Sequence, residues 1–170
     1  MQVLSEFSSE QKPFAFILSC IDSRSPVEII FDQGIGDLFS ARVAGNIINE
    51  DILASAEFAV NIVGAKLIMI LGHTKCGAMG ACLNQTKDGY LKKLIEKIEP
   101  TYLKYKNEVD SNAQPQDKLS EYNVLESMQI LIDKSDILRQ ALRDKKIIIA
   151  GSIFHLDSGK VEVLRVLDKL

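Results

Sequence analysis

The sequence has no tryptophan, and only three cysteines, two histidines and four prolines among 170 residues. Three is an odd and small number, which does not suit a disulfide framework and favours a reducing compartment, so we expect the cytoplasm. No apolar run approaches the roughly 20 residues that a membrane-spanning helix needs, and residues 1–13 lack the pattern of a secretory signal. The net charge of −3 and the scattered lysines give no basic patch for nucleic acid. These absences argue against a secreted disulfide scaffold, a membrane partner and a nucleic-acid partner.

The composition that remains is typical of a globular protein. Hydrophobic residues make up 46% of the chain and charged residues 25%. A chain of 170 residues is long enough for one well-buried domain and too short for two. We therefore expect residues 1–170 to form a single domain.

Apolar runs alternate with helical patterns along the chain. Buried strands are predicted at 14–19, 38–43, 66–71 and 146–154, and after a turn at 157–159 a final strand at 161–167. Helices are predicted at 26–31, 51–63, 76–83 and 91–105, the last kinked or divided at Pro100. We expect a surface loop at 110–117, and Asn123 with Glu126 resembles a capping box that starts another helix, broken near Ser135. This order predicts an α/β fold: a mainly parallel central sheet of about four parallel strands plus one antiparallel edge strand, flanked by helices.

Chemically active residues follow the first and third of these strands. Cys20-Ile21-Asp22-Ser23-Arg24 comes after one, and His73-Thr74-Lys75-Cys76 after the other. Ligands of such sheets bind at the carboxyl ends of the strands, and two thiolates with one imidazole suit zinc, which leaves a fourth position for water. The alternative is that these are inert buried cysteines, because a lone His-x-x-Cys is a weak signal and Cys20 joins it only if the two strands are neighbours. Cys82 lacks a comparable setting, and we interpret it as a core residue.

Three motifs together resemble the signature of the β-class carbonic anhydrases. They are Cys20-x-Asp22-Ser23-Arg24, Arg42-x-Ala44-Gly45-Asn46 and Gly72-His73-x-x-Cys76-Gly77, and the likeness extends from about Gln11 to the C-terminal hairpin. The resemblance implies one Zn²⁺ per chain, held by Cys20, His73 and Cys76. It implies reversible hydration of carbon dioxide to bicarbonate and a proton through a zinc-bound hydroxide. Asp22 either pairs with Arg24, leaving the fourth position to water, or becomes the fourth ligand in a closed state.

The resemblance also assigns roles around the substrate, carbon dioxide or bicarbonate. The residues concerned are Gln11, Gly77, Phe39 and Phe58. The amide of Gln11 would face the substrate, Gly77 would offer a backbone N–H to bicarbonate, and the two phenylalanines would line the pocket, often that of a dimer partner. Core or interface packing is the alternative for the three side chains. Ile17 stands where allosteric members have tryptophan, so the non-allosteric, plant-like subtype is the better match in a bacterial-type chain.

The family likeness further implies a homodimer. Relatives carry additional N-terminal helices, so we expect a shortened N-terminal arm here, and that puts a tetramer in doubt without excluding it. Two alternatives of function remain: hydrolysis of carbon disulfide or carbonyl sulfide on the same fold, and a zinc-stabilised relative without catalysis. A thiol redox protein fits less well, because no Cys-x-x-Cys is present.

Overall fold

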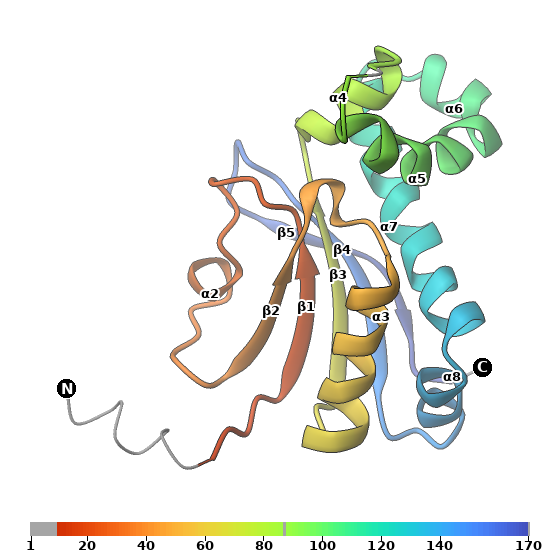
Figure 1. The fold of residues 1–170 in the computed structure, drawn as a ribbon. Helices are drawn as coiled ribbons and strands as arrows, with labels where there is room; N and C mark the ends of the chain where they lie inside the picture. Colours follow the sequence, from red (N-terminus) through yellow and green to blue (C-terminus); the bar gives the residue numbers. More distant parts are fainter. Residues whose placement is uncertain (1–9, 87, 170) are drawn as a thin grey trace.

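A five-stranded sheet forms the centre of the computed structural model, which describes residues 10–86 and 88–169 (Figure 1). The strand order is β2-β1-β3-β4-β5. The strands are β1 Ala15–Ser19, β2 Leu38–Arg42, β3 Leu67–His73, β4 Ile148–Phe154 and β5 Val161–Leu167. The first four run parallel and β5 is antiparallel to β4, with an irregularity in the pairing between Gly151 and Ser152. The α/β fold predicted from the sequence is therefore confirmed.

The helices fill the connections between the strands. They are α2 Val27–Ile30, α3 Glu50–Glu57, α4 Gly77–Leu83, α5 Leu91–Lys104, α6 Lys106–Asp110, α7 Pro115–Lys134 and α8 Asp136–Arg143, with short helical segments η1 Ala44–Asn46 and η2 Phe58–Val63. Helix α3 is capped by the side chain of Asn49, which accepts a hydrogen bond from the Ile52 amide at 2.9 Å. It continues as η2 to Gly64, whose φ of 88° ends the helix in the left-handed region that glycine adopts readily.

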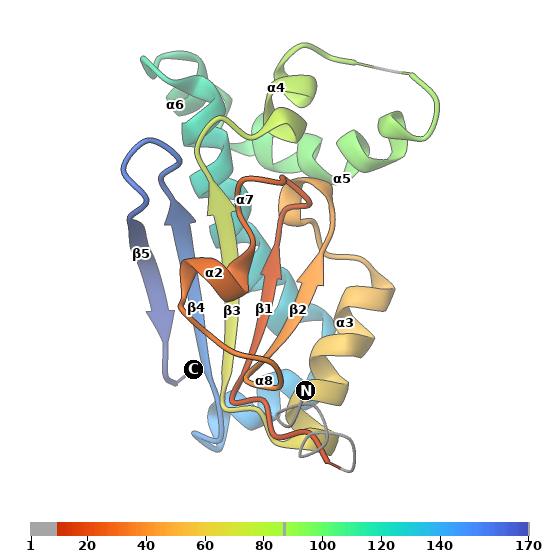
Figure 2. The ribbon, with the colours of Figure 1, turned by 90° about the vertical axis from the view of Figure 1, so that its left-hand side faces the viewer.

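The helices cover the two faces of the sheet unequally (Figures 1 and 2). Helices α3, α7 and α8 lie on one face, where they enclose the largest core cluster together with β1, β3 and β4. Among the helices of the described residues, only α2 lies on the other face, over a smaller cluster that includes Ala15, Ile17 and Val27. Helices α4, α5 and α6 gather beyond the carboxyl ends of the strands. Helices α4, α5 and α6 thus cover the carboxyl ends of the strands.

Three sequence-based expectations about the helices differ from the structure. The capping box at Asn123 does not start a helix, because α7 begins at Pro115, a residue suited to the first helical turn. Asn123 lies inside α7 and is 4% exposed, and its side chain bonds to another loop instead of capping. The expected loop at 110–117 is shorter than predicted, since α6 ends at 110 and α7 begins at 115. Helix α5 runs through Pro100 without being divided.

Within the described ranges, no helix combines the length and the apolar character needed to cross a membrane.

Candidate metal centre

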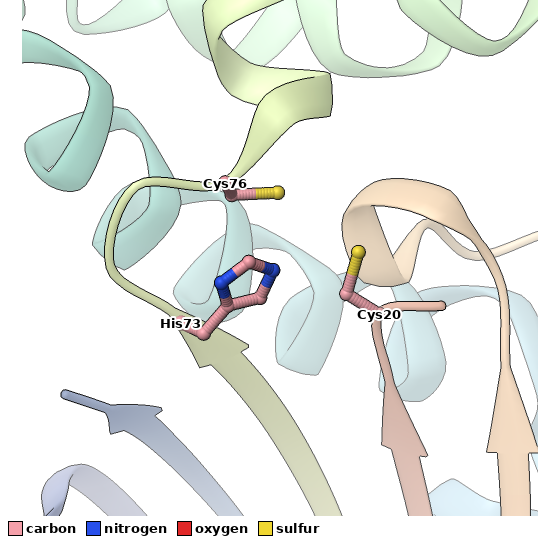
Figure 3. Close-up of side chains that lie close together, drawn as sticks. All are labelled: Cys20, His73 and Cys76. Atoms are coloured by element: carbon pink, nitrogen blue, oxygen red, sulfur yellow. The ribbon is translucent and has the colours of Figure 1, made fainter. Parts of the chain in front are cut away.

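Two cysteines and one histidine converge beyond the carboxyl ends of β1 and β3 (Figure 3). Cys20 follows β1 directly, His73 is the last residue of β3, and Cys76 occupies the N-cap position of α4. The potential ligand atoms of the three residues all lie within 4.8 Å of one another, and each residue is at least 95% buried. Because β1 pairs directly with β3, the requirement that the two motifs sit on neighbouring strands is met.

His73 is oriented so that one ring nitrogen faces the cluster without a partner. Its Nδ1 lies 2.9 Å from the carbonyl oxygen of Thr74, which can only accept, so Nδ1 carries the proton. Its Nε2 is buried and has no hydrogen-bond partner among the residues that the structure describes. A buried acceptor without a partner is costly, and a ligating histidine is commonly held through its other nitrogen in this way. The residues present therefore fit a bound metal ion.

The pKa values of the two cysteine thiols are shifted in opposite directions. The pKa of Cys20 is lowered to about 4, chiefly by a hydrogen bond with Cys76; burial opposes this shift, and His73 and the amide of Gly45 add to it. That amide lies 3.3 Å from the Cys20 sulfur. The pKa of Cys76 is raised, because its thiol bonds to Cys20 and is buried. Without a cation, the pair therefore favours one thiolate and one thiol. A divalent ion would allow both sulfurs to carry charge, as zinc sites require.

Asp22 and Arg24 form a two-pronged ion pair beside the cluster. Arg24 donates from Nε to Oδ1 at 2.9 Å and from an Nη to Oδ2 at 2.7 Å, and its backbone amide donates to Oδ1 at 2.9 Å. The hydrogen bonds from Arg24 hold the pKa of the Asp22 carboxyl well below its usual range. Its Oδ2 lies 3.9 Å from Nε2 of His73. The carboxylate therefore borders the cluster while both of its oxygens bond to Arg24.

Arg42 ties the loop after β1 to β2. Its guanidinium donates to the carbonyl oxygen of Cys20 at 2.9 Å and to that of Asp22 at 2.5 Å. Gly77 follows Cys76 as the first residue of α4, and the space beside its Cα is open. A molecule at the cluster can therefore approach the backbone of Gly77 without meeting a side chain there.

Three of the predicted substrate-binding residues do not reach the cluster within one chain. Gln11 precedes β1 whereas Cys20 follows it, so at least the length of this five-residue strand, about 17 Å, separates them. Phe39 and Phe58 meet edge to face with their ring centroids 6.2 Å apart. They line a hollow of about 570 Å³ beside β2, together with Arg42. Their predicted roles require a second subunit and stay predictions.

Sequence reasoning missed a group of polar residues that bond to the loops of the cluster. Gln116, Asp117, Ser120 and Asn123 all lie in the first half of α7 and reach these loops through hydrogen bonds. The only signal in the sequence is a polar stripe at positions 116, 120 and 123 beside apolar residues of the same helix. Such a stripe is indistinguishable from an exposed helix face until the fold is known.

The fold and the site define a class of protein: an α/β metalloprotein with a Cys–His–Cys cluster at the carboxyl edge of its sheet. More particularly, the chain belongs to the carbonic anhydrase family, whose model matches residues 15–161. Carbonic anhydrase 2 of Mycobacterium tuberculosis is 37% identical over 160 residues, covering 91% of this chain and 75% of the relative. The β-carbonic anhydrase CafA of Aspergillus fumigatus has a similar structure, with a TM-score of 0.89 at 28% identity over 96% of this chain and 80% of that one. The family predicted from the three motifs is confirmed.

Proposed function

We propose that this chain catalyses the reversible hydration of carbon dioxide to bicarbonate and a proton, with one Zn²⁺ held by Cys20, His73 and Cys76. The observation that carries the proposal is the buried cluster with its unpartnered Nε2, next to a paired Asp22 and Arg24, in a member of the carbonic anhydrase family. In catalytic sites zinc lowers the pKa of a bound water to about 7, and two thiolate ligands would keep that pKa somewhat higher here, so the metal would supply a nucleophile at neutral to mildly alkaline pH.

The surrounding residues orient the reactants. Arg24 keeps Asp22 ionised, so the carboxylate could accept a hydrogen bond from a hydroxyl group at the cluster and fix the direction of that group. In a closed state, which low pH would favour, Asp22 would leave Arg24 and supply the fourth ligand. The backbone N–H of Gly77 would bond bicarbonate on the open side of the cluster. Two thiolates donate more charge to a metal than neutral imidazoles do, so the pKa of a bound water would be higher here. Activity should therefore rise with pH through the mildly alkaline range.

A homodimer would complete the site. Gln11 lies at the amino end of β1, and Phe39 and Phe58 lie in a separate hollow, so these side chains can serve only the cluster of another subunit. Phe58 is 47% exposed, as expected for an aromatic residue that a partner covers. A tetramer would need a further interface beyond this one.

The cytoplasm is the proposed compartment. The three cysteines are free thiols, and two of them belong to the metal cluster. Thiolate ligands stay reduced most readily in a reducing compartment.

The decisive test is stopped-flow measurement of carbon dioxide hydration at about pH 7 and pH 8.5, with the zinc content of the same sample determined. We expect about one zinc ion per chain and faster hydration at the higher pH. A Cys20→Ser variant serves as the control for metal-dependent turnover. Full zinc occupancy without turnover at either pH would contradict the enzymatic function. Turnover of carbon disulfide in place of carbon dioxide would assign the related hydrolase activity.

A further inference from the structure

The first half of α7 contacts each of the loops that bear the cluster. Gln116 donates from Nε2 to the carbonyl oxygen of Cys76 at 2.6 Å, and Ser120 donates from Oγ to that of His73 at 3.1 Å. Asn123 donates from Nδ2 to the carbonyl oxygen of Gly45 at 2.9 Å. These three positions are four and three residues apart, so they share one face of the helix. One rigid element therefore contacts the surroundings of all three candidate ligands.

The contact of Asn123 leads to Cys20 through a single glycine. The carbonyl oxygen of Gly45 accepts from Asn123, and the amide of the same residue donates to the Cys20 sulfur. Gly45 has a φ of 68°, and a Cβ there would lie 3.0 Å from Ile98 Cδ1 and 3.1 Å from Ala78 Cβ. Both its conformation and its close packing thus require glycine. Asn123 is 4% exposed, so its amide cannot bond to solvent instead.

The contact of Ser120 fixes the end of β3. Its hydroxyl is fully buried and bonds to the carbonyl of His73, so it holds the backbone from which the imidazole projects. Two residues after His73, Lys75 has a φ of 55°, a backbone conformation that is unfavourable for residues other than glycine, asparagine or aspartate. The carboxylate of Asp117 accepts from the amide of Lys75 at 2.5 Å and stabilises this turn between His73 and Cys76. The loop is therefore held in its ligating shape from α7.

We propose that the first half of α7 is the positioning element of the metal site, and that Gln116, Ser120 and Asn123 are positioning residues that set its affinity for metal. The inference rests on the proposed zinc function. None of the three side chains belongs to the Cys20–His73–Cys76 cluster; each contacts the backbone carbonyl of a candidate ligand or, for Asn123, that of Gly45. Partners of this kind typically contribute a factor of about 10 to 100 in metal affinity. Because the folded chain already holds the ligands in place, metal binding requires little rearrangement of them.

The test compares three variants with two matched controls in the full chain. The variants are Asn123→Ala, Ser120→Ala and Gln116→Met. The first control is Ser127→Ala, because Ser127 is also a buried serine of α7, 3% exposed, and makes no hydrogen bond to the cluster loops within the described residues. The second is Gln129→Met, since Gln129 is exposed on α7 and its side chain bonds to Asp133 of the same helix, away from the cluster loops. Three quantities are measured: the zinc dissociation constant by chelator competition, the visible spectrum of the Co²⁺-substituted protein, and the thermal midpoint of the zinc-free protein.

We expect each positioning variant to bind zinc about 10- to 100-fold more weakly and to alter the Co²⁺ spectrum, while both controls keep the wild-type affinity and spectrum. The zinc-free thermal midpoints of Ser120→Ala and Ser127→Ala measure how far each variant loses stability, and an altered Co²⁺ spectrum is a change that a loss of stability alone does not produce. Wild-type affinity and spectrum in all three variants would overturn the inference and leave the proposed function intact. A wild-type chain that binds no zinc would overturn both. If Asn123→Ala does not fold, Gln116→Met at its half-buried position gives the same readout.

Discussion

At the residue scale, the candidate site depends on a carboxylate that is held by a neighbour two positions away. A free aspartate beside three metal ligands would be drawn to the metal and would close the fourth position. The guanidinium of Arg24 offers two parallel donors that match the two oxygens of Asp22, a geometry that lysine cannot reproduce. A third donor comes from the backbone of Arg24 itself. The state of Asp22 is therefore decided mainly within a three-residue segment.

Replacing Arg24 with alanine should release Asp22 and weaken catalysis. We expect kcat/KM for carbon dioxide hydration to fall about 10- to 100-fold, because a partner that orients a group of the metal site has been removed. Arg24→Lys should recover only part of the loss. Zinc content should remain near that of wild type, since Arg24 does not contact the three candidate ligands. The measurement is stopped-flow hydration with metal analysis. Arg143→Ala, at an exposed position that ends α8, is the control. Unchanged kcat/KM in Arg24→Ala would show that the ion pair has no part in turnover.

The same ion pair predicts how stability depends on acid. Arg24 lowers the pKa of Asp22 in the folded state below the value of about 3.9 in an unfolded chain. A group whose folded pKa is lowered stabilises the protein fully above the unfolded pKa, and the stabilisation disappears as pH falls through the folded pKa. Zinc-free wild type should therefore be more stable than zinc-free Asp22→Asn at about pH 6 and should lose that advantage progressively as the pH falls below about 3.9. Thermal unfolding across this range measures it, and a constant difference at every pH would contradict it.

At the scale of elements, α7 lies close to the sheet because two strand residues there lack side chains. Gly72 of β3 and Gly151 of β4 both face α7. A Cβ on Gly72 would lie 2.7 Å from Val124 Cγ2 and 3.0 Å from Ser120 Oγ. A Cβ on Gly151 would lie 2.4 Å from the sulfur of Met128. The same close approach brings the polar face of α7 within hydrogen-bond distance of the end of β3.

Gly72→Ala should consequently destabilise the protein by about 1–3 kcal/mol, the usual cost of overpacking a tight core. Val124 is β-branched, so its side chain has few alternative rotamers that would relieve the clash, and the strand or the helix must shift. Because Gly72 precedes His73, the shift should also weaken zinc binding. Denaturant unfolding and chelator competition measure the two effects. Gly34→Ala is the control, since its Cβ would meet only Asp37 Oδ2, at 3.3 Å. Equal stability of Gly72→Ala and Gly34→Ala would show that the interface between α7 and β3 can adapt.

The elements also show which parts of the fold local sequence determines. The strands could be predicted because each is a short apolar run bounded by turn residues, and β1 is buried along its whole length. The start of α7 could not, because an asparagine followed by a glutamate three residues later has the same pattern whether it caps a helix or lies within one. The folded chain shows that Asn123 lies within the helix, where its side chain bonds to Gly45, 78 residues away.

The candidate site divides in the same way. Cys20, His73 and Cys76 could be found because ligands must occur as particular residue types at short spacings near strand ends. Gln116 could not, because its contact with Cys76 spans 40 positions and involves a backbone carbonyl that any residue provides. A residue that bonds to a backbone carbonyl places no constraint on the residue type at that position, so the sequence shows no sign of the contact. Identification of such residues therefore needs the folded chain.

At the scale of the whole molecule, the sheet presents an exposed apolar region at its β2 edge. The hollow beside β2 contains Phe16, Phe39 and Phe58, and the ring of Phe58 is 47% exposed. An edge strand with apolar side chains beside it is unfavourable in water and invites pairing with another chain. The edge also lies next to Arg42, which bonds to the loop of Cys20 and Asp22. A partner bound there would therefore border the metal site as well.

Phe58→Arg should separate the proposed dimer and reduce activity together. An aromatic anchor at the centre of an interface typically contributes about 2 kcal/mol or more, so the dimer dissociation constant should rise at least about 30-fold. Activity should fall with dimer content, because in the proposed dimer Gln11, Phe39 and Phe58 would complete the cluster of the other subunit. Light scattering after size exclusion and stopped-flow hydration at several protein concentrations measure the two quantities. Leu103→Arg is the control, because Leu103 is 61% exposed on α5, away from β2. A wild-type monomer with full activity, or a monomeric Phe58→Arg with undiminished kcat/KM, would show that one chain forms the complete site and that the β2 edge has another role.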